Sequence, residues 1–282
     1  MGVSDPLVDV AWLRAALSGP NPPRVLDVRW RLGGPPPREA FEAGHVPRAG
    51  YLDLETELAG PVRADRVGGR HPLPDQQVLA TSLRRLGVDV GRIVVVMDEA
   101  DGTSAARAWW LLRHAGHPDV RQLDGGWRAW VTSGGAVEVG PGREQPPGDF
   151  VAGWGRMPTL DATDAADLAR EGVLLDARAA ARFRGEAEPV DPVAGHIPGA
   201  VSAPADEDLA EDGTWLPVGV LRRRYVGLGV DAGRALGAYC GSGVTAAHTV
   251  LALARLGLVA ALYPGSWSDW VSDPARPVET GT

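Results

Sequence analysis

The sequence predicts an α/β protein built from two tandem copies of one unit, each a mostly parallel sheet with helices on both faces. Three observations lead to this prediction. Short apolar runs alternate with longer stretches of helical periodicity. The same motifs recur in the same order in both halves of the 282 residues, and a stretch rich in glycine and proline separates the halves. Continuous apolar runs are typical of parallel strands, because helices cover both faces of such a sheet.

Two short motifs recur in the order expected of a duplicated unit. An apolar strand ends with Asp and Arg close together at Val25–Arg29 and again at Leu174–Arg178. A Gly-His-Val-Pro turn follows within Phe41–Pro47, and a Gly-His-Ile-Pro turn lies within Val193–Ala200. Because both motifs occur in both halves, we interpret their aspartates, and His196, as structural groups that hydrogen-bond to backbone.

A second strand in each half leads into a helix. The run Ile93–Met97 ends at Asp98, and its counterpart Ala235–Tyr239 ends at Cys240. Helical patterns follow the two runs, over Ser104–Ala115 and Val244–Leu256. The halves then close with tryptophan-rich turns, at Asp124–Trp130 and Pro264–Trp270. We expect these indole rings to pack in the core rather than to stack on bases.

The repeat defines the expected domain organisation. We expect a first domain over 1–140, a linker over 141–157 where glycine and proline interrupt the pattern, and a second domain over 158–282. At the end of the equivalent strand the first domain carries Asp98 and the second carries Cys240. A carboxylate at that point would repel an anionic substrate, so the first domain is predicted to be catalytically inactive.

Composition excludes several classes of function. The formal net charge is −8 and no basic tract appears, which argues against a nucleic-acid partner. All 28 basic residues are arginine, and without lysine neither Schiff-base chemistry nor a lysine-anchored pyridoxal cofactor is available. The single cysteine allows neither an internal disulfide nor a cysteine-based metal site. We therefore expect no metal and no cofactor.

The expected location is the cytoplasm. The N-terminal residues lack a basic region followed by an apolar core, so no signal peptide is predicted. No uninterrupted apolar run reaches the ~18 residues that a membrane span needs. We accordingly expect a soluble protein with no membrane partner.

Cys240 is the strongest candidate for chemistry. It lies in the run Ala-Tyr-Cys-Gly-Ser-Gly-Val-Thr, between a strand and a helix. The backbone N–H groups of a glycine-rich loop and the positive end of a helix dipole both favour the thiolate, which is the nucleophilic form. The alternative is a small buried apolar side chain, as in most free cysteines. The surrounding loop favours the catalytic interpretation.

These features resemble the tandem-domain rhodanese-type sulfurtransferases, from about Asp9 to about Val278. The loop Cys240–Thr245 is similar to that of the 3-mercaptopyruvate sulfurtransferases, whereas thiosulfate-specific rhodaneses typically carry basic residues at its second and third positions. The resemblance implies two rhodanese-like domains, each a mostly parallel sheet flanked by helices on both faces. It also implies sulfur transfer through a persulfide on Cys240.

The resemblance implies roles for individual residues. Cys240 matches the nucleophile, and Arg178 matches the arginine that holds the substrate carboxylate. His45 is a candidate for a residue near the domain interface, and Arg182 and Arg184 are candidates for further substrate contacts. The loop residues that match the sulfur cradle are Gly241, Ser242, Gly243, Val244 and Thr245.

The loop also bears on the choice of sulfur donor. Thiosulfate and its leaving group sulfite are dianions and need positive charge beside the cysteine, which Gly241 and Ser242 do not provide. 3-Mercaptopyruvate carries one carboxylate, which a single arginine can bind in bidentate fashion. The neutral loop therefore favours mercaptopyruvate, unless Arg70 or Arg107 adds charge, and the loop around His71 could border the cleft. The expected acceptor is a thiol, thioredoxin included, or cyanide.

Three alternatives stay open at this point. A thiosulfate sulfurtransferase would use the same fold and the same cysteine. A non-enzymatic sulfur carrier would take sulfur from a partner protein without turning over a small donor. A phosphatase of the related fold is disfavoured, because its loop is one residue longer and ends in a phosphate-binding arginine that this chain lacks.

Overall fold

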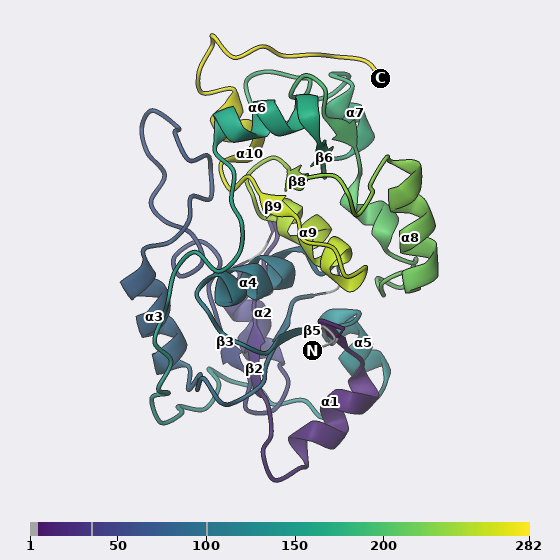
Figure 1. Ribbon diagram of the computed structural model, residues 1–282. Coiled ribbons are helices and arrows are strands. Elements are labelled where there is room, and N and C mark those ends of the chain that lie inside the picture. Colours follow the sequence, from purple (N-terminus) through teal and green to yellow (C-terminus); the bar gives the residue numbers. More distant parts are fainter. Residues whose placement is uncertain (1–4, 35, 100) are drawn as a thin grey trace. The chain divides into compact units, whose positions relative to one another are not determined.

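A computed structural model describes residues 5–34, 36–99 and 101–282 (Figure 1). The chain forms two compact units, which exchange two segments relative to a simple division at the repeat. The first unit comprises the described residues up to Gly60, Pro74–Arg156 and Glu211–Trp215. The second comprises Pro61–Leu73, Met157–Ala210 and Leu216–Thr282. The expected domain boundaries did not anticipate this exchange.

The described part of the first unit contains a five-stranded sheet in the order β1-β5-β4-β2-β3, and its neighbouring strands are all parallel. The strands are β1 (Leu7–Val8), β2 (Arg24–Asp27), β3 (Gly50–Tyr51), β4 (Val94–Met97) and β5 (Val120–Leu123). The helices are α1 (Val10–Leu17), α2 (Pro37–Ala43), α3 (Gln76–Arg85), α4 (Thr103–His114) and α5 (Gly126–Thr132).

The second unit contains a four-stranded parallel sheet in the order β7-β6-β8-β9. Its strands are β6 (Val173–Asp176), β7 (Val201–Ser202), β8 (Leu236–Tyr239) and β9 (Ala261–Leu262). Its helices are α6 (Ala162–Glu171), α7 (Ala180–Phe183), the 3₁₀ turn η1 (Ala205–Asp208), α8 (Val218–Gly227), α9 (Thr245–Arg255) and α10 (Ser266–Trp270).

The central strands are covered on both faces, which confirms the predicted fold class. Every residue of β2, β4, β6 and β8 is buried. In the second unit, Leu174 and Tyr239 pack in one cluster with Leu168 of α6. The alternate residues of a strand point to the opposite face, and α9 contacts β8 and β9. Among the described residues, no helix combines the length and apolar character needed to cross a bilayer.

The two units differ where the strands β4 and β8 end. Asp98 follows β4 and is buried, at 2% exposure. It accepts hydrogen bonds from the backbone N–H groups of Gly102 (3.0 Å) and Ala105 (3.1 Å) and from the Ser104 hydroxyl (3.1 Å). Burial, together with the nearby charge of Asp101, nevertheless raises the pKa of Asp98 to about 7. Asp98 thus takes up a proton in the folded state at a pH where the unfolded chain is ionised.

The raised pKa predicts a pH-dependent stability. Between about pH 4 and about pH 7 the unfolded state binds fewer protons than the folded state, so the unfolding free energy falls by up to roughly 1.4 kcal/mol per pH unit as pH rises. Asp98→Asn removes this dependence. Urea denaturation should therefore show that the unfolding free energy of the variant, relative to that of the wild type, is higher at about pH 8 than at about pH 5. An equal difference at both pH values would contradict a raised pKa.

Candidate active site

Cys240 directly follows β8 and precedes α9. Its Sγ accepts a hydrogen bond from the backbone N–H of Gly243, at 3.1 Å, and the residue is 2% exposed. Helix α9 begins at Thr245, so the positive end of its dipole lies at the same loop. Both the N–H group and the dipole stabilise negative charge on the sulfur.

The turn after β9 packs against the cysteine loop and is hydrogen-bonded to it. Gly243 has a φ of +81°, and a Cβ at this position would lie 2.2 Å from the carbonyl oxygen of Pro264. Ser266 is also left-handed, at φ 54°, although it is not glycine. Its Oγ accepts from the N–H of Cys240 (3.1 Å), and the N–H of Trp267 donates to the Cys240 carbonyl (2.9 Å). The strained Ser266 thus occurs where the turn is hydrogen-bonded to Cys240.

The segment 61–73 supplies further neighbours of the loop. The Nδ1 of His71 lies 2.9 Å from the Oγ of Ser242, although the two residues are 171 positions apart in sequence. The N–H of Arg70 donates to the Ser268 hydroxyl (3.0 Å), so the segment is fixed to α10 as well. His71 therefore lies at the loop, as the sequence had suggested.

Two arginine side chains lie against Gly241. A Cβ at Gly241 would come within 2.9 Å of Arg70 Nη2 and 3.4 Å of Arg182 Nη1. The two side chains are 18% and 19% exposed, so each guanidinium is partly accessible. Glycine at this loop position leaves the space that both guanidinium groups occupy. A loop that is neutral in sequence therefore has two cations beside it.

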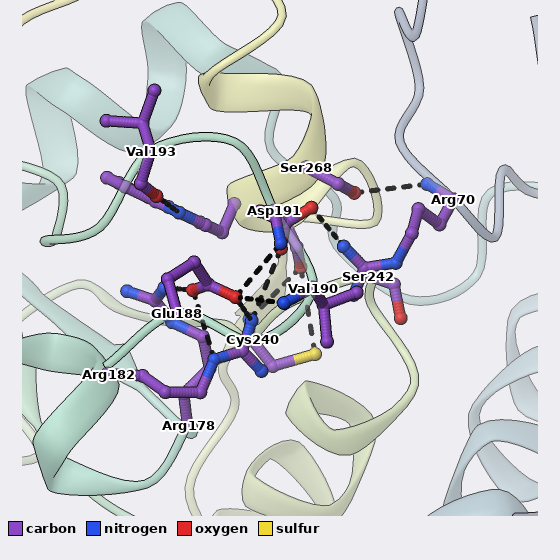
Figure 2. Close-up of polar contacts among 12 residues, drawn as sticks. Arg70, Arg178, Arg182, Glu188, Val190, Asp191, Val193, Cys240, Ser242 and Ser268 are labelled. Carbon is purple, nitrogen blue, oxygen red and sulfur yellow. Dashed lines mark hydrogen bonds and ion pairs between the residues drawn. The ribbon is translucent and has the colours of Figure 1, made fainter. Parts of the chain in front are cut away.

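Two carboxylates balance these cations (Figure 2). Glu188 accepts from Arg182 Nε (3.1 Å) and Nη2 (2.6 Å). Asp191 pairs with Arg70 and accepts from Arg182 Nη2 at 3.3 Å. Burial alone would raise the pKa of Glu188, but the hydrogen bonds from Arg182 and from the N–H groups of Asp191 and Val190 hold it below its ordinary value. The four side chains together carry no net formal charge.

Arg178 has a structural place in the second unit, and its expected role toward the donor carboxylate stays a prediction. Its Nε and Nη2 donate to Asp176 (3.0 and 2.6 Å), and Nη2 also donates to the Gly195 carbonyl (2.6 Å). The remaining Nη1 lies 3.3 Å from Glu188, and the side chain is 1% exposed. Burial alone would lower the pKa of Arg178, but the charge of Asp176 raises it above its ordinary value. Four of its five N–H donors therefore have partners within the protein.

The first unit repeats this arrangement without a cysteine. Arg29 donates to Asp27 through Nε (3.0 Å) and Nη2 (2.5 Å), and Nη2 also donates to the Gly44 carbonyl (3.1 Å). Because the first unit has the same bonds without a cysteine, they are part of the fold and need no substrate.

His45 also has a structural place, and its candidacy as a site residue stays a prediction. It is fully buried, its Nδ1 lies 2.9 Å from the Phe41 carbonyl, and its ring stacks on Phe41 with centroids 4.0 Å apart. His196 repeats the pattern, with Nδ1 2.8 Å from the Phe183 carbonyl and ring centroids 3.7 Å apart. The interpretation of His196 as structural agrees with these contacts.

The other candidates fall into two groups. Arg184 pairs with Glu186 at the surface (2.7 Å), and that exposed pair does not bring it to the cysteine. Arg107 is fully buried in the first unit and donates to the Leu58 carbonyl (3.2 Å). The loop residues Gly241, Ser242, Gly243, Val244 and Thr245 adjoin Cys240 as expected, and their roles toward a donor stay predictions.

The fold and the loop together define a class of protein: a duplicated α/β chain whose second copy alone carries a cysteine at a helix N-terminus. Comparison with protein families agrees. The model described as the rhodanese-like domain matches residues 9–133 and again residues 161–273. The chain belongs to the rhodanese family.

Similar proteins span nearly the whole chain. A Mycobacterium tuberculosis protein provisionally named thiosulfate sulfurtransferase SseB is 46% identical, with 98% of this chain and 97% of that protein covered. A Pseudomonas aeruginosa protein provisionally named 3-mercaptopyruvate sulfurtransferase is also 46% identical, with 98% of both chains covered. The crystal structure of the Escherichia coli 3-mercaptopyruvate sulfurtransferase SseA matches with a TM-score of 0.82 at 32% identity, covering 94% of this chain and 99% of SseA. The expected resemblance to tandem-domain sulfurtransferases is confirmed, and with it the expectation of an enzyme.

The buried ion pair between Arg178 and Asp176 leads to a prediction. Arg178→Ala leaves Asp176 buried without its partner, which typically costs roughly 3–5 kcal/mol of unfolding free energy. The matched variant Arg29→Ala should lose a similar amount, because Asp27 is left in the same state. Urea denaturation measures both. If Arg178→Ala instead kept wild-type stability and only raised KM for a donor, Arg178 would be a substrate contact after all.

Proposed function

We propose that this chain transfers sulfane sulfur from 3-mercaptopyruvate to a thiol or cyanide through a persulfide on Cys240. The observation that carries the proposal is the Sγ of Cys240, hydrogen-bonded to the N–H of Gly243 at the start of α9, next to two charge-balanced arginines. A sulfur placed there is stabilised both as the attacking thiolate and as the persulfide anion. The proposal includes a cytoplasmic location and thioredoxin among the thiol acceptors, as expected from the sequence.

Arg182 and Arg70 are proposed to hold the donor carboxylate in place of Arg178. Both lie against Gly241, next to the nucleophile, and both are partly exposed. Guanidinium groups bind carboxylates through paired N–H donors. Ion pairs with Glu188 and Asp191 fix the two side chains before the donor arrives, so less entropy is lost on binding.

The proposed reaction has two steps. The Cys240 thiolate attacks the mercaptopyruvate sulfur, an S–S bond forms, and the C–S bond breaks with its electron pair on the pyruvate enolate. The proton on the transferred sulfur passes to the enolate, which leaves pyruvate and the persulfide anion. An acceptor thiolate or cyanide then attacks the outer sulfur and releases the Cys240 thiolate. No net oxidation occurs, so no redox cofactor is needed.

Ser242 and His71 are proposed to assist the proton transfer. The Ser242 hydroxyl lies one residue from Gly241 in the loop and 2.9 Å from His71 Nδ1. A hydroxyl held by an imidazole can both donate and accept a proton at a developing enolate oxygen.

A thiosulfate sulfurtransferase is the second candidate. It is favoured by the name of the M. tuberculosis relative, which matches this chain at the same 46% identity as the P. aeruginosa relative. The charge balance argues the other way, because Arg70 and Arg182 are neutralised by Asp191 and Glu188. A site with no net charge suits a donor with one carboxylate better than a dianion with a dianionic leaving group.

Intact-mass measurement and donor kinetics test the proposal together. Incubation with 3-mercaptopyruvate should add one sulfur atom to the wild type and none to Cys240→Ser, which keeps the size of the side chain but lacks the thiol. The wild-type kcat/KM should be larger for mercaptopyruvate than for thiosulfate. A larger value for thiosulfate would replace the first candidate by the second. No mass gain with either donor would leave only the sulfur-carrier alternative.

The charge balance also predicts how donor preference changes. Asp191→Asn and Glu188→Gln each leave one net positive charge at the site. The ratio of kcat/KM for thiosulfate to that for mercaptopyruvate should then rise about tenfold or more, because one added charge interaction at about 4 Å is worth about 1 kcal/mol in water and about 4 kcal/mol at an effective dielectric constant of about 20. Glu186→Gln, at the exposed Arg184 pair, is the matched control and should leave the ratio unchanged. An unchanged ratio in all three variants would refute the charge argument.

A further inference from the structure

The first unit has a cavity lined by arginines at the amino-terminal end of β2. Its volume is about 570 Å³. The arginines that line it are Arg14, Arg24, Arg48 and Arg92, and its described lining contains neither aspartate nor glutamate. Arg24 is buried, Arg92 is half-buried, and Arg14 and Arg48 are exposed, so the cations extend from the floor of the cavity to its rim. Its apolar wall consists of Leu17, Pro22, Pro23, Val25 and Trp130.

Arg24 is a buried cation without a carboxylate partner among the described residues. The residue is 3% exposed. Its Nε donates to the Leu86 carbonyl and its Nη1 donates to the Arg48 carbonyl, so both bonds are to neutral groups. Burial, with a contribution from Arg92, lowers the pKa of Arg24 to about 10. A charge taken out of water without a counter-ion is costly for the fold.

The second unit is a natural control for these residues. Aligned on the shared Asp and Gly-His-x-Pro motifs, Arg24 corresponds to Val173 and Arg48 to Gly199. The backbone is left-handed at Arg48, with a φ of 65°, and at Gly199, with a φ of 80°. The second unit therefore has an apolar residue and a glycine where the first has two arginines joined by a hydrogen bond.

A third difference between the units matches the first two. Gly50 of β3 corresponds to Val201 of β7, and both pair with the equivalent leucine of the neighbouring strand. A Cβ at Gly50 would lie 2.5 Å from Arg24 Nη2, so the glycine makes room for the guanidinium. A buried charge, a left-handed non-glycine residue and a compensating glycine thus occur together. The first two lower stability, and neither is needed to form this fold.

A second cavity beside Arg24 differs in its charge balance. It has a volume of about 630 Å³, and its charged lining consists of Arg24, Arg38, Arg84, Arg85, Arg143 and Glu144. Arg38, Arg85 and Arg143 pair with Glu42, Glu57 and Glu138, respectively, whereas Arg84 donates to the Phe150 carbonyl and the Thr81 hydroxyl. None of the four arginines of the 570 Å³ cavity has such a partner among the described residues. Carboxylates thus balance three of the arginines of the 630 Å³ cavity, whereas no carboxylate is found in the described lining of the 570 Å³ cavity, in a chain whose net charge is −8.

We propose that the 570 Å³ cavity binds a small organic phosphate, with the phosphate group on Arg24 and Arg48 and the apolar part against Trp130 and Leu17. Guanidinium groups match phosphate oxygens in geometry and charge. The volume is far larger than a phosphate ion and falls in the range of sites for small organic ligands. The bound anion would supply the counter-ion that Arg24 lacks.

Calorimetric titration at constant ionic strength tests the proposal with two probes, phenyl phosphate and inorganic phosphate. The wild type should bind both, and phenyl phosphate more tightly because its ring adds apolar contact. Arg24→Val and Arg48→Gly, which copy Val173 and Gly199, should weaken binding of each probe roughly tenfold or more. Arg38→Ala, in the neighbouring cavity, is the control and should bind as the wild type does.

Two results would overturn this inference. One is the absence of phenyl phosphate binding by the wild type. The other is unchanged binding by Arg48→Gly, which keeps the backbone carbonyl that Arg24 needs and should fold at least as stably, because glycine suits a left-handed φ. Thermal unfolding of each variant without ligand checks its folding, so that lost binding in Arg48→Gly reports on the site itself.

Discussion

The buried pair between Asp176 and Arg178 is the interaction on which the rest of the second unit depends. It fixes the end of β6 to the Gly-His-Ile-Pro turn through the Gly195 carbonyl. The same guanidinium lies 4.5 Å from the ring centroid of Trp267, and the backbone N–H of Trp267 donates to the Cys240 carbonyl. One cation therefore connects the first strand, the histidine turn, the tryptophan helix and the nucleophile. In the first unit Arg29 makes the corresponding contacts, with Trp127 at 4.8 Å.

Duplication separates the requirements of the fold from those of chemistry. Whatever both copies share, such as the Asp-Arg pair and the stacked Phe-His pair, serves the sheet and its turns. A feature that occurs in only one of the two copies needs another explanation. In the second unit that remainder is Cys240 with its arginines and carboxylates. In the first unit it is the Arg24 cavity, at the opposite end of the strands from Asp98.

The sequence was sufficient for the fold and for the place of the cysteine loop, because both depend on local patterns. Apolar runs, helical periodicity and the Cys-Gly-Ser-Gly loop place β8, Cys240 and α9 within one or two residues of where they lie. The sequence does not show that Arg178 and His45 are buried against carboxylate and carbonyl partners, so it could not separate a structural role from a role toward the donor. Arg70 could not be placed for a different reason. Its position beside Gly241 depends on a tertiary contact between segments far apart in the chain.

The exchange of segment 61–73 into the second unit has a consequence for how the molecule is made. A ribosome completes Arg70 and His71 long before it reaches Cys240, so these two residues must wait for partners that emerge near the end of synthesis. When the first half folds, segment 61–73 still lacks its partners Ser242 and Ser268. The second half translated alone would lack the segment itself. A gene divided at the repeat boundary would therefore yield neither half with a complete site. The repeat boundary divides the sequence into two similar halves, but the residues around Cys240 come from both of them.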